Sequence, residues 1–181
     1  ADAIQAGIVC VPEERQKQGA IIELSIAQNI SLPQLSKLNP NGVLNDAKEW
    51  ALADEYAKRL HVKSFSWKQG VDTLSGGHQH KVVIGKWLAT HPDVIILDEP
   101  TKGIDIGTIA AVHEFISELA AEGMTIIMIS SELLELIGMS DRVMVMREGL
   151  VEGILDRSDL DAEVLVRAAT GNAGDDADEG K

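Results

Sequence analysis

The chain has 181 residues, of which 45% are apolar and 25% are charged, values typical of a single globular domain. A net charge of −13 disfavours general binding to nucleic acid, which needs a basic face, and gives no reason to expect docking on anionic lipid. Cys10 is the one cysteine, so an intrachain disulfide and a cysteine-rich zinc site are excluded. No apolar stretch of the sequence is long enough to cross a membrane.

Short apolar runs predict the strands of an α/β domain. Four runs are continuous, at residues 8–11, 94–97, 125–129 and 143–146. Continuous runs are typical of strands covered on both faces, as in parallel sheets. Apolar residues recur at helical spacing in residues 50–60, 79–89 and 109–121. Cys10 lies in the first run, so we expect a buried and inert thiol.

Residues 25–70 differ from this alternation of strands and helices. They contain no strong strand pattern and are interrupted at Pro33, Pro40 and Gly42. We interpret them as a helical insert between the first and second strands of a domain that spans residues 1–170.

The sequence pattern of residues 145–181 predicts a hairpin, then a helix, then a tail. Glu148 and Gly149 separate two strand-like segments within residues 145–155. Residues 156–169 predict a last helix with Ser158 as its candidate cap. The acidic residues 171–181 predict a disordered tail.

An apolar strand at residues 94–97 ends in two adjacent carboxylates, Asp98 and Glu99. Ligands of open α/β sheets bind beyond the carboxyl ends of the strands. A carboxylate there can hold Mg²⁺, and the next one, which points the other way, can orient a water for attack on a terminal phosphate. The alternative is a strand end with two solvated acids, because short motifs often occur without function.

A second segment, Leu-Ser-Gly-Gly-His-Gln at residues 74–79, opens the helix that runs to residue 89. Gly76 and Gly77 allow a backbone to approach a ligand closely, and a helix start presents unpaired N–H groups, so an anion site is one interpretation. The other is a plain loop in which Ser75 caps the helix and the two glycines form a turn.

Taken together and in this order, the motifs resemble those of ATP-binding-cassette (ABC) ATPases. The segment at 74–79 is similar to the signature motif, the strand with Asp98 and Glu99 to the Walker B motif, and residues 101–105 to the D-loop, and the similarity covers about residues 7–149. In detail, residues 11–15, 25–30, 74–88 and 130–142 resemble the second cassette of bacterial importers of ribose, galactose or xylose type, in which two cassettes are fused.

The resemblance implies an α/β, three-layer P-loop NTPase fold with a helical subdomain insert. One expected part is missing, because the sequence holds no Gly-x-x-x-x-Gly-Lys-Ser/Thr loop (Walker A) to cradle the α- and β-phosphates. Gly85 and Lys86 do not replace it, since they lie inside a predicted helix. We therefore expect the chain to be an N-terminally truncated fragment.

The resemblance also implies roles for the signature half of the site. Ser75, Gly76 and Gly77 would contact the γ-phosphate of ATP bound to the partner cassette. Gln79 would support that helix start, and Asp105 would lie at the seam between the two cassettes.

Within this chain's own nucleotide site, the resemblance makes Asp98 the Mg²⁺ ligand and Glu99 the general base. Glu13 occupies the position of the usual Q-loop glutamine and Ser131 that of the usual switch histidine. A carboxylate beside a polyphosphate is repulsive unless a cation such as Arg15 or Mg²⁺ screens it, and a serine cannot share a proton as imidazole does. We expect this chain's own site to hydrolyse ATP slowly or not at all.

Further expectations follow from the same family. They are ATP and Mg²⁺ as cofactors, a partner cassette fused upstream, transmembrane permease subunits at the helical insert, a periplasmic sugar-binding protein as an indirect partner, no nucleic acid, and a peripheral place at the cytoplasmic face of the inner membrane. The activity would be ATP hydrolysis that energises monosaccharide import, with the isolated fragment inactive. Two alternatives remain: a regulatory half that binds nucleotide without hydrolysing it, and a soluble ABC ATPase outside transport.

Overall fold

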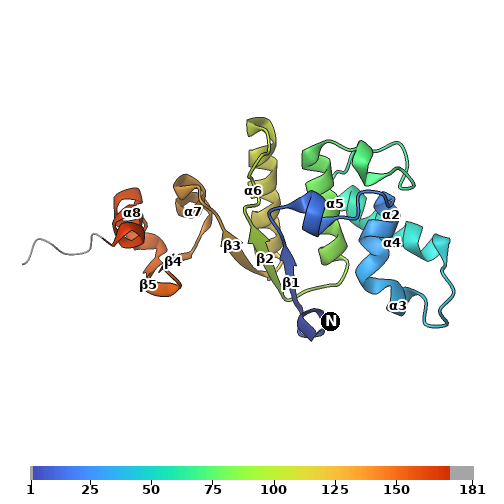
Figure 1. Cartoon of the computed structure of the whole chain (residues 1–181), viewed down its shortest axis with the longest axis horizontal. Helices are drawn as coiled ribbons and strands as arrows, with labels where there is room; N and C mark the ends of the chain where they lie inside the picture. The colour runs from blue at the N-terminus through green and yellow to red at the C-terminus, as the bar shows by residue number, and fades with distance from the viewer. Residues whose placement is uncertain (1, 172–181) are drawn as a thin grey trace, which may run out of the picture. The chain divides into compact units, whose positions relative to one another are not determined.

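The structure is a computed structural model that describes residues 2–171, without the side chains of residues 15, 16 and 106 (Figure 1). The chain divides into two compact units, Ala1–Ile129 and Ser130–Lys181. The first unit contains, in chain order, α1 (Asp2–Gln5), β1 (Ile8–Val11), the π-helical turn η1 (Arg15–Gly19), α2 (Ile26–Ser31), η2 (Leu32–Gln34), α3 (Leu35–Leu38), α4 (Asp46–Arg59), η3 (Val71–Thr73), α5 (Gly76–Leu88), β2 (Val94–Asp98), α6 (Ile106–Ala121) and β3 (Thr125–Ile129). The second contains α7 (Leu133–Met139), β4 (Arg142–Arg147), β5 (Leu150–Asp156), η4 (Arg157–Asp159) and α8 (Ala162–Thr170). Among the helices of residues 2–171, none has the length and apolar character that a membrane span needs.

A parallel sheet with the order β1-β2-β3 forms the centre of the first unit. Val11 pairs with Leu97, and Asp98 pairs with Ile129, so the three strands run in register to the same edge. Helix α5 packs against β1 and helix α6 against β3 (Figure 1). The predicted α/β class with parallel strands is confirmed.

The faces of this sheet are covered unequally. In β1, Val9 and Val11 are buried, whereas Ile8 and Cys10 are exposed. In β3, Ile127 is 47% exposed. The prediction that the strands are covered on both faces, and with it the burial of Cys10, is therefore wrong for the described residues. An apolar run shows that a strand can be buried, but it does not show what packs on each face.

Residues 25–70 form helices, and the strand-like pairing they contain is the single bridge between Ser25 and Gly70. Ser25 begins α2 with a reciprocal capping box: its hydroxyl accepts from the Gln28 N–H, and the Gln28 side chain accepts from the Ser25 N–H. Helix α2 packs against both α4 and α5, and Ile26 and Ile30 are fully buried. Apolar burial between helices thus holds these residues onto α5.

The second unit is built on the predicted hairpin. Strands β4 and β5 pair antiparallel through a turn in which Glu148 and Gly149 both have positive φ. A two-residue turn with positive φ at both positions matches the twist of a hairpin. The apolar run at residues 143–146 therefore belongs to this hairpin and not to the parallel sheet.

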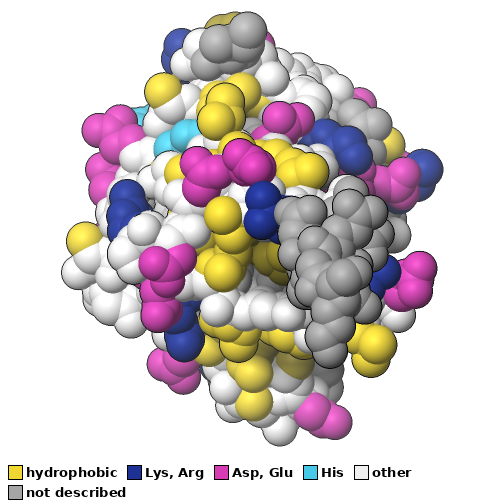
Figure 2. All heavy atoms as spheres, turned by 90° about the vertical axis from the view of Figure 1, so that its left-hand side faces the viewer, with side chains coloured by type: hydrophobic (Ala, Val, Ile, Leu, Met, Phe, Trp, Pro, Cys, Tyr) yellow, Lys and Arg dark blue, Asp and Glu magenta, His cyan; other side chains and the backbone are white. Residues whose placement is uncertain are grey.

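One side of the hairpin is packed and the other is exposed. Val143 and Val145 are buried in a cluster with Leu165 of α8, whereas Met144 and Ile154 are more than half exposed. On the face shown in Figure 2, exposed apolar side chains lie among interspersed acidic and basic ones.

The last helix begins later than predicted, at Ala162. Asp161 caps it by accepting from the Glu163 N–H at 2.8 Å, whereas the hydroxyl of Ser158, the predicted cap, lies in η4 and donates to Asp159. The Ser158 prediction is wrong because β5 extends to residue 156 and leaves a separate turn before the helix. Residues 172–181, most of the predicted tail, lie outside the described residues.

A buried lysine ties α5 to the segment that follows β1. Lys86 is only 8% exposed, and its Nζ donates to the carbonyl oxygen of Gly19 at 2.9 Å. Burial lowers the pKa of this amine, and the ring of Trp87 lies 5.0 Å from the charge. The residue that sequence analysis set aside as a false phosphate-binding lysine thus has a structural role.

Replacing Lys86 by methionine tests this role. The change keeps most of the aliphatic chain but leaves the buried Gly19 carbonyl without its donor, so the free energy of unfolding should fall by about 1 to 3 kcal/mol. Lys37→Met, at an exposed position of α3, is the control and should stay within about 0.5 kcal/mol. Urea unfolding of both variants measures the difference, and equal stabilities would contradict the role.

Candidate functional site

Two acids lie where β2 reaches the carboxyl edge of the parallel sheet. Asp98 is the last residue of β2, and both Asp98 and Glu99 are half-buried. Glu99 takes a positive φ of 50°, which is uncommon for a residue with a side chain, and its N–H donates to the Ile129 carbonyl at 2.8 Å. This bond fixes the turn out of the strand, and with it the backbone that carries Glu99.

A lysine that sequence analysis missed lies at the same edge. Lys102 Nζ contacts Glu13 Oε1 at 2.8 Å, and the Lys102 N–H donates to the Glu99 carbonyl at 3.2 Å. The hydrogen bond and charge of Glu13 raise the pKa of Lys102, with smaller contributions from Glu99 and Asp98. Lys102 is therefore a cation that screens Glu13. The side chain of Arg15, the cation that the sequence suggested for this role, lies outside the described residues, so that suggestion stays a prediction. The sequence shows that Lys102 follows Asp98 by four residues, but it does not show that Lys102 pairs with Glu13.

Cys10 lies near enough to Asp98 to be affected by its charge. Partial burial and, second, the negative charge of Asp98 raise the pKa of its thiol. A raised pKa keeps the thiolate population small at neutral pH, so the thiol is expected to be unreactive although it is exposed.

Ser75 starts α5 without capping it. Ser75 occupies the N-cap position in extended conformation, and its side chain makes no capping hydrogen bond. Ser75 and Gly76 are exposed, so the hydroxyl and the first N–H groups of the helix face solvent. The alternative in which Ser75 serves as a helix cap is wrong.

Gln79 holds the loop in front of this helix start. Its buried side-chain amide donates to the carbonyl oxygens of Val71 and Leu74, each at 3.2 Å. These two bonds join the first turn of α5 to the turn η3. The contact is the kind expected of a residue that supports the helix start, and its role towards a nucleotide stays a prediction.

Asp105 lies beside the same helix. It caps α6 by accepting from the Thr108 N–H at 3.1 Å and from the Thr108 hydroxyl at 2.7 Å. A Cβ atom placed on Gly77 would lie 3.7 Å from the Thr108 methyl carbon. The capped corner at Asp105 and the start of α5 are therefore neighbours, as a seam that uses both would require.

Ser131 belongs to the second unit and follows β3 by two residues. It is exposed in a turn that Ser130 fixes, because the Ser130 hydroxyl donates to buried Glu135 at 2.6 Å and accepts from the Glu132 N–H at 3.0 Å. Its predicted place at a γ-phosphate stays a prediction.

A family model described as ABC transporter matches residues 3–102, more than half of the chain. The chain belongs to the ABC transporter family. Ribose import ATP-binding protein RbsA 2 of Rhizobium johnstonii is 63% identical over 172 residues, which cover 95% of this chain and 34% of that protein. Ribose import ATP-binding protein RbsA of Geobacillus kaustophilus is 48% identical over 169 residues, covering 93% and 34%. The chain thus spans about a third of the length of these curated relatives.

Solved structures of ABC cassettes share the fold. A nucleotide-free ATP-binding cassette from an ABC transporter is 20% identical with a TM-score of 0.69, over 92% of this chain and 70% of that one. A dimeric cassette in a post-hydrolysis state bound to ADP and Pi is 23% identical with a TM-score of 0.69, over 83% and 62%. The predicted P-loop NTPase fold is confirmed.

The carboxylates at the sheet edge of this ABC chain could bind Mg²⁺ only together with ligands from outside this group, such as phosphates or water. Among residues 2–171, no three His, Cys, Asp or Glu side chains gather as a metal site. Mg²⁺ is commonly held by one or two carboxylates together with substrate phosphates and water. The half-buried carboxylate of Asp98 fits that arrangement.

The Glu13–Lys102 pair can be tested by removing each charge. If the phosphates of a nucleotide lie at this edge, as the resemblance predicts, Lys102→Gln should weaken nucleotide binding in the full-length protein, because it leaves Glu13, Asp98 and Glu99 without this cation. Glu13→Gln should strengthen binding, and the double variant should return close to the wild type. Fluorescent ATP-analogue titrations at low and high salt measure these changes, with an unchanged thermal midpoint as the folding control. Equal affinities for both single variants would contradict the screening role.

Proposed function

We propose that this chain is part of an ATPase that energises import of a monosaccharide across a bacterial inner membrane. The observation that carries the proposal is the start of α5, where Ser75 and Gly76 are exposed, the Ser75 hydroxyl is not used as a cap, and Gln79 holds the preceding loop. Relatives up to 63% identical are named ribose import ATP-binding proteins. These names favour a function in import over the function of a soluble ABC ATPase outside transport.

At this helix start, the chain would grip a phosphate that another cassette holds. Unpaired N–H groups of a helix start and a free hydroxyl are hydrogen-bond donors, and they stabilise negative charge. Ser75, Gly76 and Gly77 would thereby contact the γ-phosphate of ATP bound by the partner cassette, with Asp105 at the seam. Closure of the two cassettes would depend on ATP because the phosphate completes these bonds.

In its own site, this half would be the weaker catalyst. Asp98 would hold Mg²⁺, which supplies charge stabilisation to the phosphates when bound. Glu99 would orient the attacking water. Glu13 adds negative charge beside the phosphates, and Lys102 only partly balances the charge of the acids there. Ser131 offers a hydroxyl at the position of the usual switch histidine, whose imidazole would accept and share a proton. A half that binds nucleotide without hydrolysing it is the second candidate, and these two substitutions favour it.

The proposal also covers the binding partners of this chain and its location in the cell. A second cassette, fused upstream, would supply the phosphate-binding loop and the opposing site. Transmembrane permease subunits would dock on the helices of residues 25–70, and a periplasmic sugar-binding protein would deliver the substrate. The protein would therefore work peripherally at the cytoplasmic face of the inner membrane.

Ser75→Ala tests the role of the helix start. Because Ser75 does not cap α5, its loss should leave the free energy of unfolding within about 0.5 kcal/mol, while ATPase turnover of the full transporter should fall about tenfold or more. Ser25→Ala, which removes a true cap from α2, should instead cost about 0.5 to 2 kcal/mol. Unchanged turnover in the Ser75 variant would contradict the proposal.

Glu99→Gln tests the asymmetry of the two sites. If this half hydrolyses little ATP, steady-state turnover of the full transporter should retain most of its value after the substitution. The equivalent substitution in the partner cassette is the matched comparison and should abolish turnover. Near-total loss on changing Glu99 alone would show that this half is a full catalyst.

A further inference from the structure

Three basic side chains gather beside the start of α5. His78 lies in the first turn of this helix, Lys81 follows it by three residues on the same side, and Lys63 belongs to the loop after α4. The backbone N–H of Lys63 donates to His78 Nδ1 at 3.3 Å, and this bond holds the loop against the helix. We call Lys63, His78 and Lys81 the basic cluster.

The positive charge of the basic cluster has no counter-charge in the described part of the chain. Burial and, second, the charge of Lys63 lower the pKa of Lys81. None of the ion pairs among residues 2–171 includes either lysine, although the sequence carries 29 acidic residues and a net charge of −13. Like charges held close together repel each other in the free protein, so this arrangement is typical of a site that binds an anion.

The basic cluster continues the site proposed at Ser75. Ser75, His78 and Lys81 are spaced by three residues, so they follow one side of the helix at intervals of about 4.5 Å along its axis. Side chains of a helix lean towards its N-terminus, so the long side chain of Lys81 reaches back over the turn before it. An anion at the exposed Ser75 hydroxyl therefore lies within about one Debye length of this charge.

His78 contributes a hydrogen-bond donor and not a charge. Burial and then the charges of Lys81 and Lys63 lower its pKa, so its ring is largely neutral at pH 7. The N–H of Lys63 uses Nδ1 as an acceptor, which leaves the ring proton on Nε2. The neutral ring thus presents one N–H group between the two lysine charges and the helix start.

We propose that the basic cluster binds the phosphates of the nucleotide that the partner cassette holds. The inference rests on the proposed function, which brings that nucleotide to Ser75, and it adds the residues that supply positive charge there. Lys63 and Lys81 attract the triphosphate towards the α5 start, and His78 donates a hydrogen bond from Nε2. Because the γ-phosphate adds negative charge, the cluster holds ATP more strongly than ADP and so favours release after hydrolysis.

The test measures the KM for ATP of the full transporter in proteoliposomes at low and high salt. The double variant Lys63→Gln with Lys81→Gln removes both charges and keeps much of the side-chain length. Its KM should rise about tenfold at low salt with little change in kcat, because the lost charges act on ATP binding rather than on the chemical step. The difference from the wild type should shrink at high salt, where exposed charges are screened.

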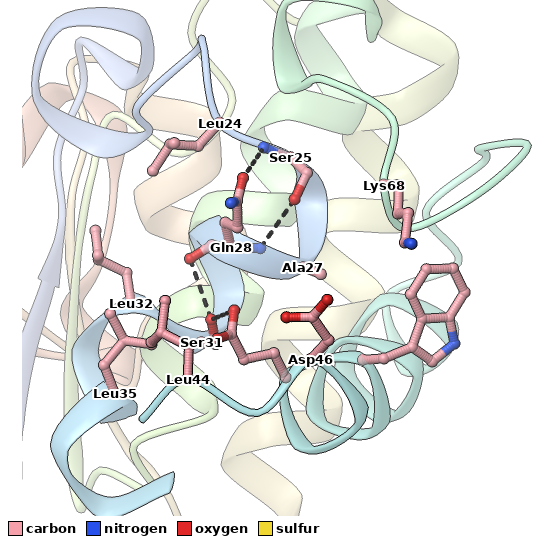
Figure 3. A pocket seen from close by; sticks show the side chains of 12 residues that line it. Leu24, Ser25, Ala27, Gln28, Ser31, Leu32, Leu35, Leu44, Asp46 and Lys68 are labelled. Atoms are coloured by element: carbon pink, nitrogen blue, oxygen red, sulfur yellow. Dashed lines mark hydrogen bonds between the residues drawn. The ribbon is translucent and has the colours of Figure 1, made fainter. Parts of the chain in front are cut away.

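Two control variants separate charge from shape. Replacing both lysines of the basic cluster by arginine keeps the charge and should recover most of the wild-type KM. Lys68→Gln removes an exposed charge from the same loop and should leave KM unchanged. Figure 3 shows that Lys68 lies instead beside a cavity, which Asp46 and the buried Glu49 also line.

Thermal unfolding without nucleotide checks that the variants are folded. The double glutamine variant should have a midpoint equal to or above that of the wild type, because it relieves the repulsion between like charges. If that variant folds poorly, the single variant at exposed Lys63 keeps the test decisive, with an expected rise in KM of about threefold.

The outcomes separate this inference from the proposed function. An unchanged KM in the glutamine variants would overturn the inference, while a loss of turnover in Ser75→Ala would leave the proposed function intact. A fall in kcat at saturating ATP with unchanged KM would mean that the cluster binds an acidic protein side chain, and it would also overturn the inference. If neither the cluster variants nor Ser75→Ala had an effect, the inference and the proposed function would fall together.

Discussion

Parallel pairing of β1, β2 and β3 is the constraint on which the candidate site depends. Because Val11 lies opposite Leu97 and Asp98 opposite Ile129, the chain leaves β1 and β2 at one edge, and Glu13, Asp98 and Glu99 arrive there together. A shift of one residue would turn the side chain of Asp98 to the other face of the sheet. The apolar strands thus bring these carboxylates to one edge, where Glu13 also forms an exposed ion pair with Lys102.

Helix α5 connects this edge to the second group of functional residues. At its start, Gln79 fastens the loop that ends in Ser75, and near its end Lys86 fastens Gly19, which follows Glu13 by six residues. Hydrogen bonds thus anchor the thirteen-residue helix α5 near both of its ends. The helix joins the segment after β1 to the exposed helix start within this unit.

Sequence patterns predicted the elements well because strands and helices impose their own periods. The apolar runs at 8–11, 94–97 and 125–129, the hairpin turn at Glu148 and Gly149, and the acids at the end of β2 all appear where local patterns placed them. The start of the last helix was displaced because both Ser158 and Asp161 are good caps, and the length of β5 decides between them.

What local patterns missed depends on contacts between distant residues. Lys102 meets Glu13 only because two parallel strands end together, and Lys86 finds Gly19 only after α5 has packed. The burial of Glu49 follows from the packing of α2 on α4. Exposure of Cys10 likewise reflects what covers one face of the sheet, a property that an apolar run does not contain.

The central claim is that this chain offers its α5 start to a phosphate held by another cassette. The direct measurement is an experimental structure of the complete transporter with a non-hydrolysable ATP analogue and Mg²⁺. The account predicts that the Ser75 hydroxyl lies within about 3.2 Å of a γ-phosphate oxygen whose other phosphates are held by the partner cassette. A nucleotide-bound, closed structure in which Ser75 still faces solvent would contradict it.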